Sequence, residues 1–173
     1  MKVGIVFGCF IPLHSGHMSL MNRSFKENDK TIIGVCGKDS DRGKDFIPFQ
    51  KRLELMQRKY QNEKTDVVPI DDEKLQLDGT FTKENWIKWG HELFKNAHMN
   101  PLDENNQFTW YTGEPQYKEK LSDIYKTHKI TLVDRNENTI SGTKIRNNVD
   151  AYKNEIAPEF LKYINERINN HEN

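Results

Sequence analysis

Residues 2–17 read KVGIVFGCFIPLHSGH, and this stretch decides the fold. Its first part, Lys2–Phe7, is a short apolar run rich in β-branched side chains, which predicts a buried strand that ends at Gly8. A helical spacing of apolar residues begins at Gly16. A buried strand that passes directly into a helix is the repeating unit of a parallel sheet with helices on its faces.

The same alternation continues along the rest of the chain. Apolar runs predict further strands at Thr31–Cys36, Val67–Ile70, Phe108–Tyr111 and Ile130–Val133. Amphipathic segments predict helices at Pro48–Tyr60, Lys83–His98, Pro115–Tyr125, a short one from Ser141, and Pro158–Ile168. The pattern indicates an α/β fold, a Rossmann-like doubly wound parallel sheet of about five strands with helices on both faces. We expect one domain over residues 1–168 and a frayed tail at 169–173.

The composition limits the classes of partner. The 173 residues carry 26 basic and 26 acidic side chains, so no net field attracts nucleic acid or an anionic membrane. No apolar run approaches the roughly 18 residues that span a bilayer. Cys9 and Cys36 are too few and too badly placed in the sequence for a disulfide framework or a zinc site. We expect a cytoplasmic protein that binds small molecules, with a homo-oligomer as one option for its assembly.

The segment Gly8–His17 is the first candidate site. In a doubly wound sheet, ligands bind beyond the carboxyl ends of the strands, in the loops that connect a strand to the next helix. Gly8 permits close backbone approach there, and Gly16 lets the next helix begin under a ligand. The free N–H groups and the dipole of that helix favour an anion.

Two histidines follow within this segment, His14 at the loop end and His17 in the first helical turn. Both can donate hydrogen bonds to phosphate oxygens and gain positive charge near them. Such a pair would hold phosphoryl groups in line, with catalysis by positioning and charge neutralisation. Alone, the pair could bind a metal or cap a helix, but the surrounding glycine, proline and strand favour phosphate. Neither a Walker A loop nor a G-x-G-x-x-G fingerprint occurs.

The second candidate site is ISGTKIR at residues 140–146, after the last predicted strand. Ser141 as a helix N-cap would turn the following amides outward to an anion. Thr143 offers a hydroxyl, and Arg146 a forked cation suited to phosphate oxygens. An ordinary capped helix with a solvated arginine is the alternative. Two helix N-termini at one end of a parallel sheet favour a shared crevice.

Together these two segments resemble the HxGH nucleotidyltransferase superfamily, whose signatures are G-x-F-x-P-x-H-x-G-H and I-S-x-T-x-x-R; both are present in full. In particular, the chain resembles the nicotinamide-nucleotide adenylyltransferase domain of NadR-type proteins from Val3 to about Arg167, including the stretches ENWIKWGHELF and WYTGEPQY. The resemblance implies transfer of the adenylyl group of ATP to nicotinamide mononucleotide (NMN), giving NAD and pyrophosphate. Mg²⁺ would arrive with the triphosphate, because Asp71 and Asp72 are interpreted as loop charges.

The resemblance and the loop positions also imply a set of site residues. The catalytic residues would be His14, His17 and Arg146. The ATP-binding residues would be Gly8, Phe10, His14, Gly16, His17, Tyr111, Ser141, Thr143 and Arg146. The NMN-binding residues would be Cys9, Gly37, Asp39, Arg52, Trp86 and Trp89. No side chain is assigned as a metal ligand.

Some of these assignments have alternatives. The tryptophans suit a cationic pyridinium ring, but core packing would explain them equally well. Cys9 stands where relatives often carry lysine or arginine, and Lys38, Arg42 or Lys44 could supply that cation. The acceptor could also be phosphopantetheine, or a polyol phosphate with CTP, although His14 and the tryptophan helix disfavour both. A module that senses NAD or ATP without turnover is the alternative from another class.

Overall fold

The computed structural model describes residues 1–37, 46–75, 82–133 and 140–172. Its centre is a five-stranded sheet in the order β3-β2-β1-β4-β5, in which every neighbouring pair is parallel. The strands are β1 (Lys2–Gly8), β2 (Lys30–Gly37), β3 (Thr65–Asp71), β4 (Gln107–Thr112) and β5 (Lys129–Leu132). The predicted Rossmann-like sheet is confirmed, with β1 in the middle where the strand order reverses.

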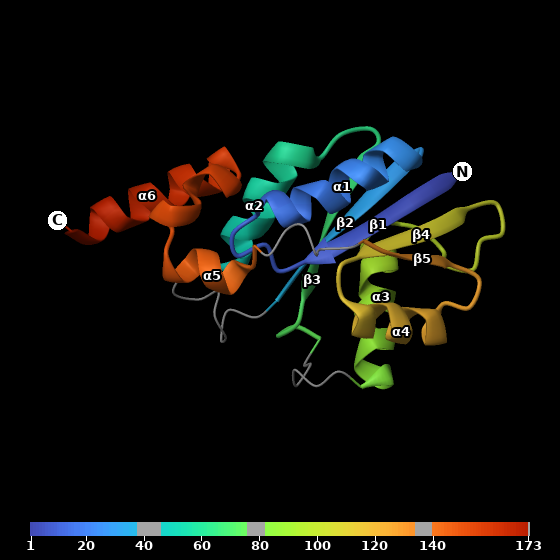
Figure 1. Ribbon diagram of the computed structural model, residues 1–173. Helices are drawn as coiled ribbons and strands as arrows, with labels where there is room; N and C mark the ends of the chain where they lie inside the picture. The colour runs from blue at the N-terminus through green and yellow to red at the C-terminus, as the bar shows by residue number, and fades with distance from the viewer. Residues whose placement is uncertain (38–45, 76–81, 134–139, 173) are drawn as a thin grey trace.

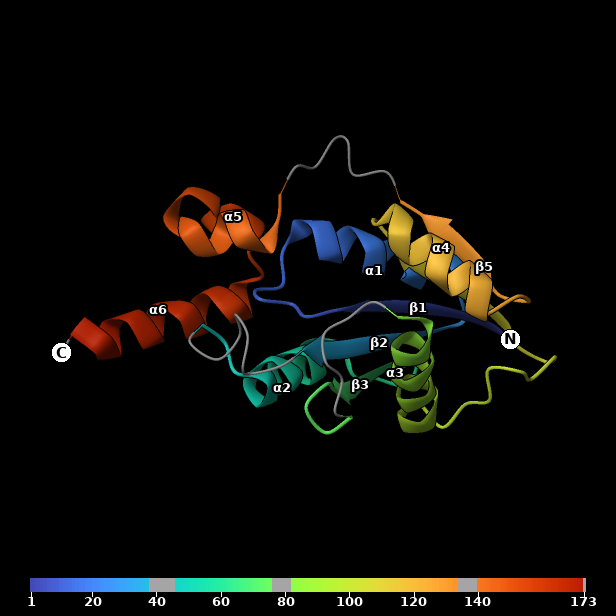
Figure 2. The ribbon, with the colours of Figure 1, turned by 90° about the horizontal axis from the view of Figure 1, so that it is seen from below.

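Helices cover both faces of this sheet. They are α1 (Ser15–Glu27), α2 (Phe49–Tyr60), α3 (Lys83–Asn96), α4 (Pro115–Ile124), α5 (Gly142–Asn147), the 3₁₀ helix η2 (Asp150–Glu155) and α6 (Pro158–Glu172). Figure 1 shows α1 and α2 on one side of the sheet and α3 and α4 on the other. Figures 1 and 2 show α5 and α6 beyond the end of the sheet at which β1 finishes.

The strand β1 carries the core on both of its faces because its side chains alternate. Val6 packs into an apolar cluster with side chains of α1, α2, α5 and α6. Ile5 and Phe7 point to the opposite face, into a second cluster formed with α3 and α4. A strand buried on both faces in this way is expected at the centre of a parallel sheet.

The last strand and the last helix differ from what the sequence predicts. The edge strand β5 is only four residues long and none of its side chains is fully buried. Helix α6 continues to Glu172, beyond the expected end at Ile168, because no glycine or proline interrupts its last turn. None of the helices in the described ranges is long and apolar enough to cross a membrane.

His128 joins three parts of the second cluster. Its Nδ1 accepts a hydrogen bond of 3.0 Å from the indole N–H of Trp110. Its Nε2 lies 2.7 Å from the carbonyl oxygen of Pro101, and its ring stacks on Tyr125 at 4.9 Å. An indole only donates and a carbonyl only accepts, so the neutral ring with its proton on Nε2 satisfies both partners. Burial lowers the pKa of His128, which opposes the charged form.

We predict that acid destabilises the fold through this residue. Because the folded-state pKa of His128 lies below its unfolded value, the unfolded chain binds the proton first as the pH falls. The contribution of neutral His128 to the free energy of unfolding is therefore present above about pH 6.5 and is lost as the pH falls below that value. Urea unfolding of the wild type and of His128→Gln across this range measures it. The variant should lose less stability on acidification; equal losses would contradict the assignment.

Candidate active site

The loop that follows β1 ends in a pair of stacked histidines. His14 is the N-cap of α1, and its Nδ1 accepts a hydrogen bond of 3.1 Å from the N–H of Gly16. His17 lies in the first turn, where its Nδ1 accepts from the N–H of His14 at 3.4 Å. The two rings stack with their centroids 3.8 Å apart and an angle of 28° between their planes. The predicted positions of both histidines are confirmed.

These backbone contacts fix the proton positions on the two rings. A nitrogen that accepts a hydrogen bond carries no proton, so each neutral ring holds its proton on Nε2. His14 is buried, whereas His17 is partly exposed. The ring of Phe10 meets His17 edge-on at 5.0 Å and so fixes its orientation. In the neutral form, each imidazole therefore carries its proton on Nε2, and both rings lie where the loop from β1 joins α1.

The second predicted motif lies against this loop. Ser141 caps α5 as expected, because its hydroxyl accepts from the N–H of Lys144 at 3.2 Å. The guanidinium of Arg146 donates from Nη1 to the carbonyl of Ile11 at 2.7 Å and from Nη2 to the Thr143 hydroxyl at 3.2 Å. The two motifs are far apart in the sequence, and the structure brings them into direct contact.

Gly142 makes this contact sterically feasible. A β-carbon at this position would lie 2.8 Å from Nη1 of Arg146 and 3.1 Å from the carbonyl oxygen of Ile11. Both distances are too short for an undisturbed side chain. The absence of a side chain at Gly142 therefore allows the Arg146 guanidinium to reach the first loop.

Arg52 of α2 lies beneath the same loop and is fully buried. Its Nη1 donates to the carbonyls of Cys9 at 2.6 Å and Cys36 at 2.8 Å, and its Nε donates to that of Ile47 at 3.0 Å. Gly37, with φ 125°, would bring a β-carbon within 3.2 Å of this guanidinium. Arg52 thus ties the ends of β1 and β2 together; its contact with a ligand phosphate stays a prediction.

Aromatic side chains form a wall beside the loop. Trp86 and Trp89 of α3 are each 8% exposed. Phe7 packs edge-on against Trp89 at 4.9 Å, and Tyr117 of α4 packs against Trp86 at 5.2 Å. Because Phe7 directly precedes Gly8, this aromatic cluster borders the end of β1. Sequence reasoning missed Phe7 and Tyr117, since no local pattern places α4 beside α3.

Tyr111 lies farther from the histidine pair than predicted. The hydroxyl of Tyr111 receives a hydrogen bond from Asn28 at 2.8 Å and donates to Glu27 at 3.2 Å, at the far end of α1. The structure therefore does not bring this hydroxyl beside His14. Asp39 lies outside the described residues, as do Lys38, Arg42 and Lys44.

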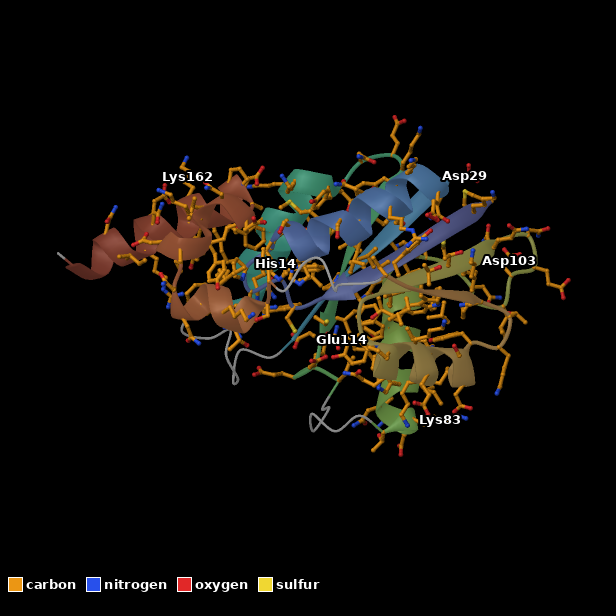
Figure 3. The ribbon with its side chains drawn as sticks, viewed as in Figure 1. His14, Asp29, Lys83, Asp103, Glu114 and Lys162 are labelled. Atoms are coloured by element: carbon orange, nitrogen blue, oxygen red, sulfur yellow. The ribbon has the colours of Figure 1, made fainter. Side chains whose placement is uncertain are left out.

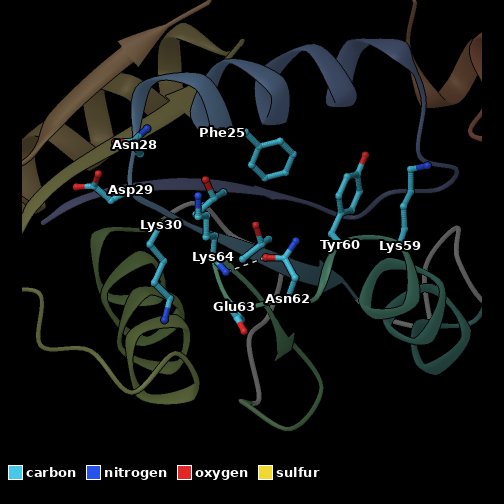
Figure 4. A pocket seen from close by; sticks show the side chains of 11 residues that line it. Phe25, Asn28, Asp29, Lys30, Lys59, Tyr60, Asn62, Glu63 and Lys64 are labelled. Atoms are coloured by element: carbon cyan, nitrogen blue, oxygen red, sulfur yellow. Dashed lines mark hydrogen bonds between the residues drawn. The ribbon is translucent and has the colours of Figure 1, made fainter.

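Figure 3 shows the polarity of the sheet. His14 and Glu114, the N-cap of α4, lie toward the carboxyl ends of the strands, while Asp29 and Asp103 lie at the other end. A cavity of about 460 Å³ opens at that other end, beside Phe25, Tyr60 and Lys64 (Figure 4). It is lined by the end of α1 and the starts of β2 and β3, so it is separate from the histidine site.

Comparison with known proteins gives a consistent picture. The family model described as "Cytidylyltransferase-like" matches residues 5–148. A nicotinamide-nucleotide adenylyltransferase of Picrophilus torridus is 28% identical over 169 residues, which cover 93% of this chain and 89% of that protein. The trifunctional NAD biosynthesis/regulator protein NadR of Escherichia coli is 26% identical over 180 residues, covering 94% of this chain and 41% of that protein.

Solved structures agree with these sequence matches. A crystal structure of NadR in complex with NAD and AMP-PNP superposes with a TM-score of 0.74 at 28% identity, covering 92% of this chain and 45% of that one. Another, of NadR in complex with NR, superposes with a TM-score of 0.75 at 28% identity, covering 92% and 44%. The chain thus spans less than half the length of the NadR proteins it matches.

We predict that Arg52 supports the fold through its carbonyl partners. Arg52→Met removes these donors and should lower the free energy of unfolding by about 2–4 kcal/mol. Arg58→Met on the same helix is the matched control. Its side chain is 72% exposed and forms a surface ion pair with Glu54, so its change should stay within about 0.5 kcal/mol. Urea unfolding measures both, and equal losses would contradict the role of Arg52.

Proposed function

This chain belongs to the cytidylyltransferase-like family, and we propose that it transfers the adenylyl group of ATP to NMN, forming NAD and pyrophosphate. The Picrophilus relative supports this choice, because it carries that activity in its name and this chain covers most of its length. The NadR structure with NAD and AMP-PNP supports nucleotide ligands of the same kinds.

The stacked histidine pair is the observation that carries the proposal. In the reaction, a phosphate oxygen of NMN bonds to the α-phosphorus of ATP, and the bond from that phosphorus to the pyrophosphate oxygen breaks. Negative charge shifts within the phosphates, and no protein nucleophile is required. With their Nδ1 atoms engaged by backbone N–H groups, His14 and His17 aim Nε2 donors at these oxygens.

Arg146 would hold the other end of the triphosphate. It already lies on the first loop through its bond to Ile11, so little movement separates it from phosphates held above the histidines. A forked guanidinium binds two phosphate oxygens at once. Ser141 and Thr143 would add polar contacts to the β- and γ-phosphates. Together the two motifs form a clamp with in-line geometry.

We also propose that Mg²⁺ arrives with the triphosphate. Among the described residues, no group of three or more His, Cys, Asp or Glu side chains is arranged to hold a metal ion. Bound to the triphosphate, the ion would neutralise part of its charge. The side chains of this chain then need only to orient the phosphates and donate hydrogen bonds to them.

The aromatic cluster would receive the nicotinamide ring. A cationic pyridinium is attracted to the face of an indole. Trp86 and Trp89 keep a small exposed fraction, and Phe7 brings their cluster to the end of β1. The NMN phosphate would then reach toward the histidine pair. Core packing and ligand contact are compatible here, because an indole packed on one face can offer its other face to a ligand.

We predict that the purified chain with Mg²⁺ makes NAD from NMN and ATP, and that His17→Ala lowers kcat. Loss of one oriented donor is expected to slow turnover by about 10²–10³-fold. A coupled assay of NAD formation measures both, and thermal unfolding should remain close to that of the wild type. His91→Ala, an exposed histidine on α3, is the matched control and should keep full activity.

Three outcomes would count against this function. Turnover of phosphopantetheine or a polyol phosphate, without turnover of NMN, would move the chain to another acceptor. Binding of NAD or ATP with no product would indicate a sensing module. Full activity of His17→Ala would remove the histidine pair from the mechanism.

We predict that Trp86→Ala weakens the binding of NMN but not that of ATP. Loss of the indole face is expected to raise the KM for NMN about tenfold while the KM for ATP stays unchanged. Ile87→Ala is the control from the same helix, because Ile87 is 46% exposed and points away from the cluster. Steady-state kinetics with each substrate varied in turn measures the effect. A lower melting temperature with an unchanged KM for NMN would make Trp86 a core residue only.

A further inference from the structure

Two cysteines meet at the carboxyl ends of β1 and β2. Gly8, the last residue of β1, pairs with Val35, so the residues that follow, Cys9 and Cys36, lie at the same level of adjacent chains. Adjacent strands are about 4.8 Å apart, which is within the Cα separation of about 4.4–6.8 Å found in disulfides. The sequence separation gives no sign of this proximity.

Both thiols also lie on the same face of the sheet. Cys9 and Cys36 pack with the aromatic cluster of α3 and α4, while Val35 points to the other face. The Cys9 sulfur lies only 3.4 Å from where a β-carbon of Gly37 would stand. A hydrogen bond that the Cys36 thiol donates to Cys9, together with burial, raises the pKa of Cys36. The two thiols are therefore within hydrogen-bonding reach of each other.

Arg52 keeps the two backbones together at this point. One nitrogen, Nη1, donates to the carbonyl oxygens of both Cys9 and Cys36. The cysteines differ in access, since Cys9 is half-buried and Cys36 is buried. A pair with one accessible and one buried thiol has the arrangement in which the first is oxidised and the second resolves it.

We propose that Cys9 and Cys36 form an oxidative modification site, which a peroxide converts reversibly to an intramolecular disulfide. The Cys9 thiolate, its proton released to solvent, attacks one peroxide oxygen and breaks the O–O bond. This gives Cys9 sulfenic acid, and the departing hydroxide takes up a proton to become water. The Cys36 sulfur then bonds to the Cys9 sulfur, and the displaced hydroxide leaves with the Cys36 proton as a second water.

The disulfide would change the loop that carries the histidines. Cys9 lies between Gly8 and Phe10, and the Phe10 ring fixes the orientation of His17. A new bond at Cys9 moves this segment and disturbs its contact with Arg52. A displacement of about 1 Å at a catalytic group can lower the rate about 10²-fold. This consequence for activity rests on the proposed function, whereas formation of the disulfide does not.

The test uses the full chain, reduced, freed of reductant and treated with hydrogen peroxide. Mass spectrometry of the intact chain should show loss of two hydrogen atoms, and peptide mapping without reductant should join the Cys9 and Cys36 peptides. Dithiothreitol should reverse both changes. Cys9 sulfinic acid as the main product, a disulfide between chains, or two unmodified thiols would overturn the proposal.

Cys36→Ala and Cys36→Ser are the matched variants, because Cys36 does not belong to the proposed substrate site. Neither should form the cross-link. Without the second thiol, prolonged peroxide treatment should carry Cys9 on to the sulfinic acid, and the activity lost in that way should not return with dithiothreitol. The wild type should lose about 10²-fold in turnover and regain it. If the cross-link forms but no NAD is made in either state, the proposed function fails and the modification site stands. Equal turnover before and after cross-linking would overturn the effect on the loop.

Discussion

The site depends on the hydrogen bonds that the buried guanidinium of Arg52 donates to main-chain carbonyls. Where β1 and β2 end, their ladder of hydrogen bonds stops and their carbonyls need other donors. Arg52 supplies them, donating to Cys9 and Cys36 from a single nitrogen and to Ile47 from Nε. Burial of such a cation is tolerated because several carbonyl dipoles surround it. The loop after β1 can then leave the sheet in one defined conformation.

The hydrogen bonds of the histidine pair both cap α1 and determine which ring nitrogen carries the proton. Each Nδ1 accepts from a backbone N–H at the start of α1, which caps the helix, and this same bond leaves Nε2 as the donor. Helix capping and phosphate binding looked like alternatives in the sequence. In the structure, the cap also orients the two rings, so the start of α1 and the proposed phosphate site would depend on the same two hydrogen bonds.

Local rules account for what the sequence predicted well. Apolar runs and helical spacing predicted the sheet, and the N-cap at Ser141 follows from residue type and position. Contacts between distant segments were beyond such rules. The carbonyl partners of Arg52, the turn of the Tyr111 hydroxyl toward Asn28, and the meeting of Cys9 with Cys36 depend on register and on which face each side chain takes. Local periodicity carries neither kind of information.

Equal numbers of acidic and basic residues leave the chain without a global field, so anion binding must come from groups placed near one another. One buried cation, Arg52, donates a hydrogen bond to a carbonyl of the loop, and Arg146 of α5 donates to another carbonyl of the same loop. Two arginines held by main-chain oxygens therefore lie at the strand ends, close to the imidazole and backbone N–H groups of the first loop. For the proposed triphosphate these donors are already held in place, so little reorganisation would be needed on binding. Such preorganisation is the property that lets a site favour a transition state.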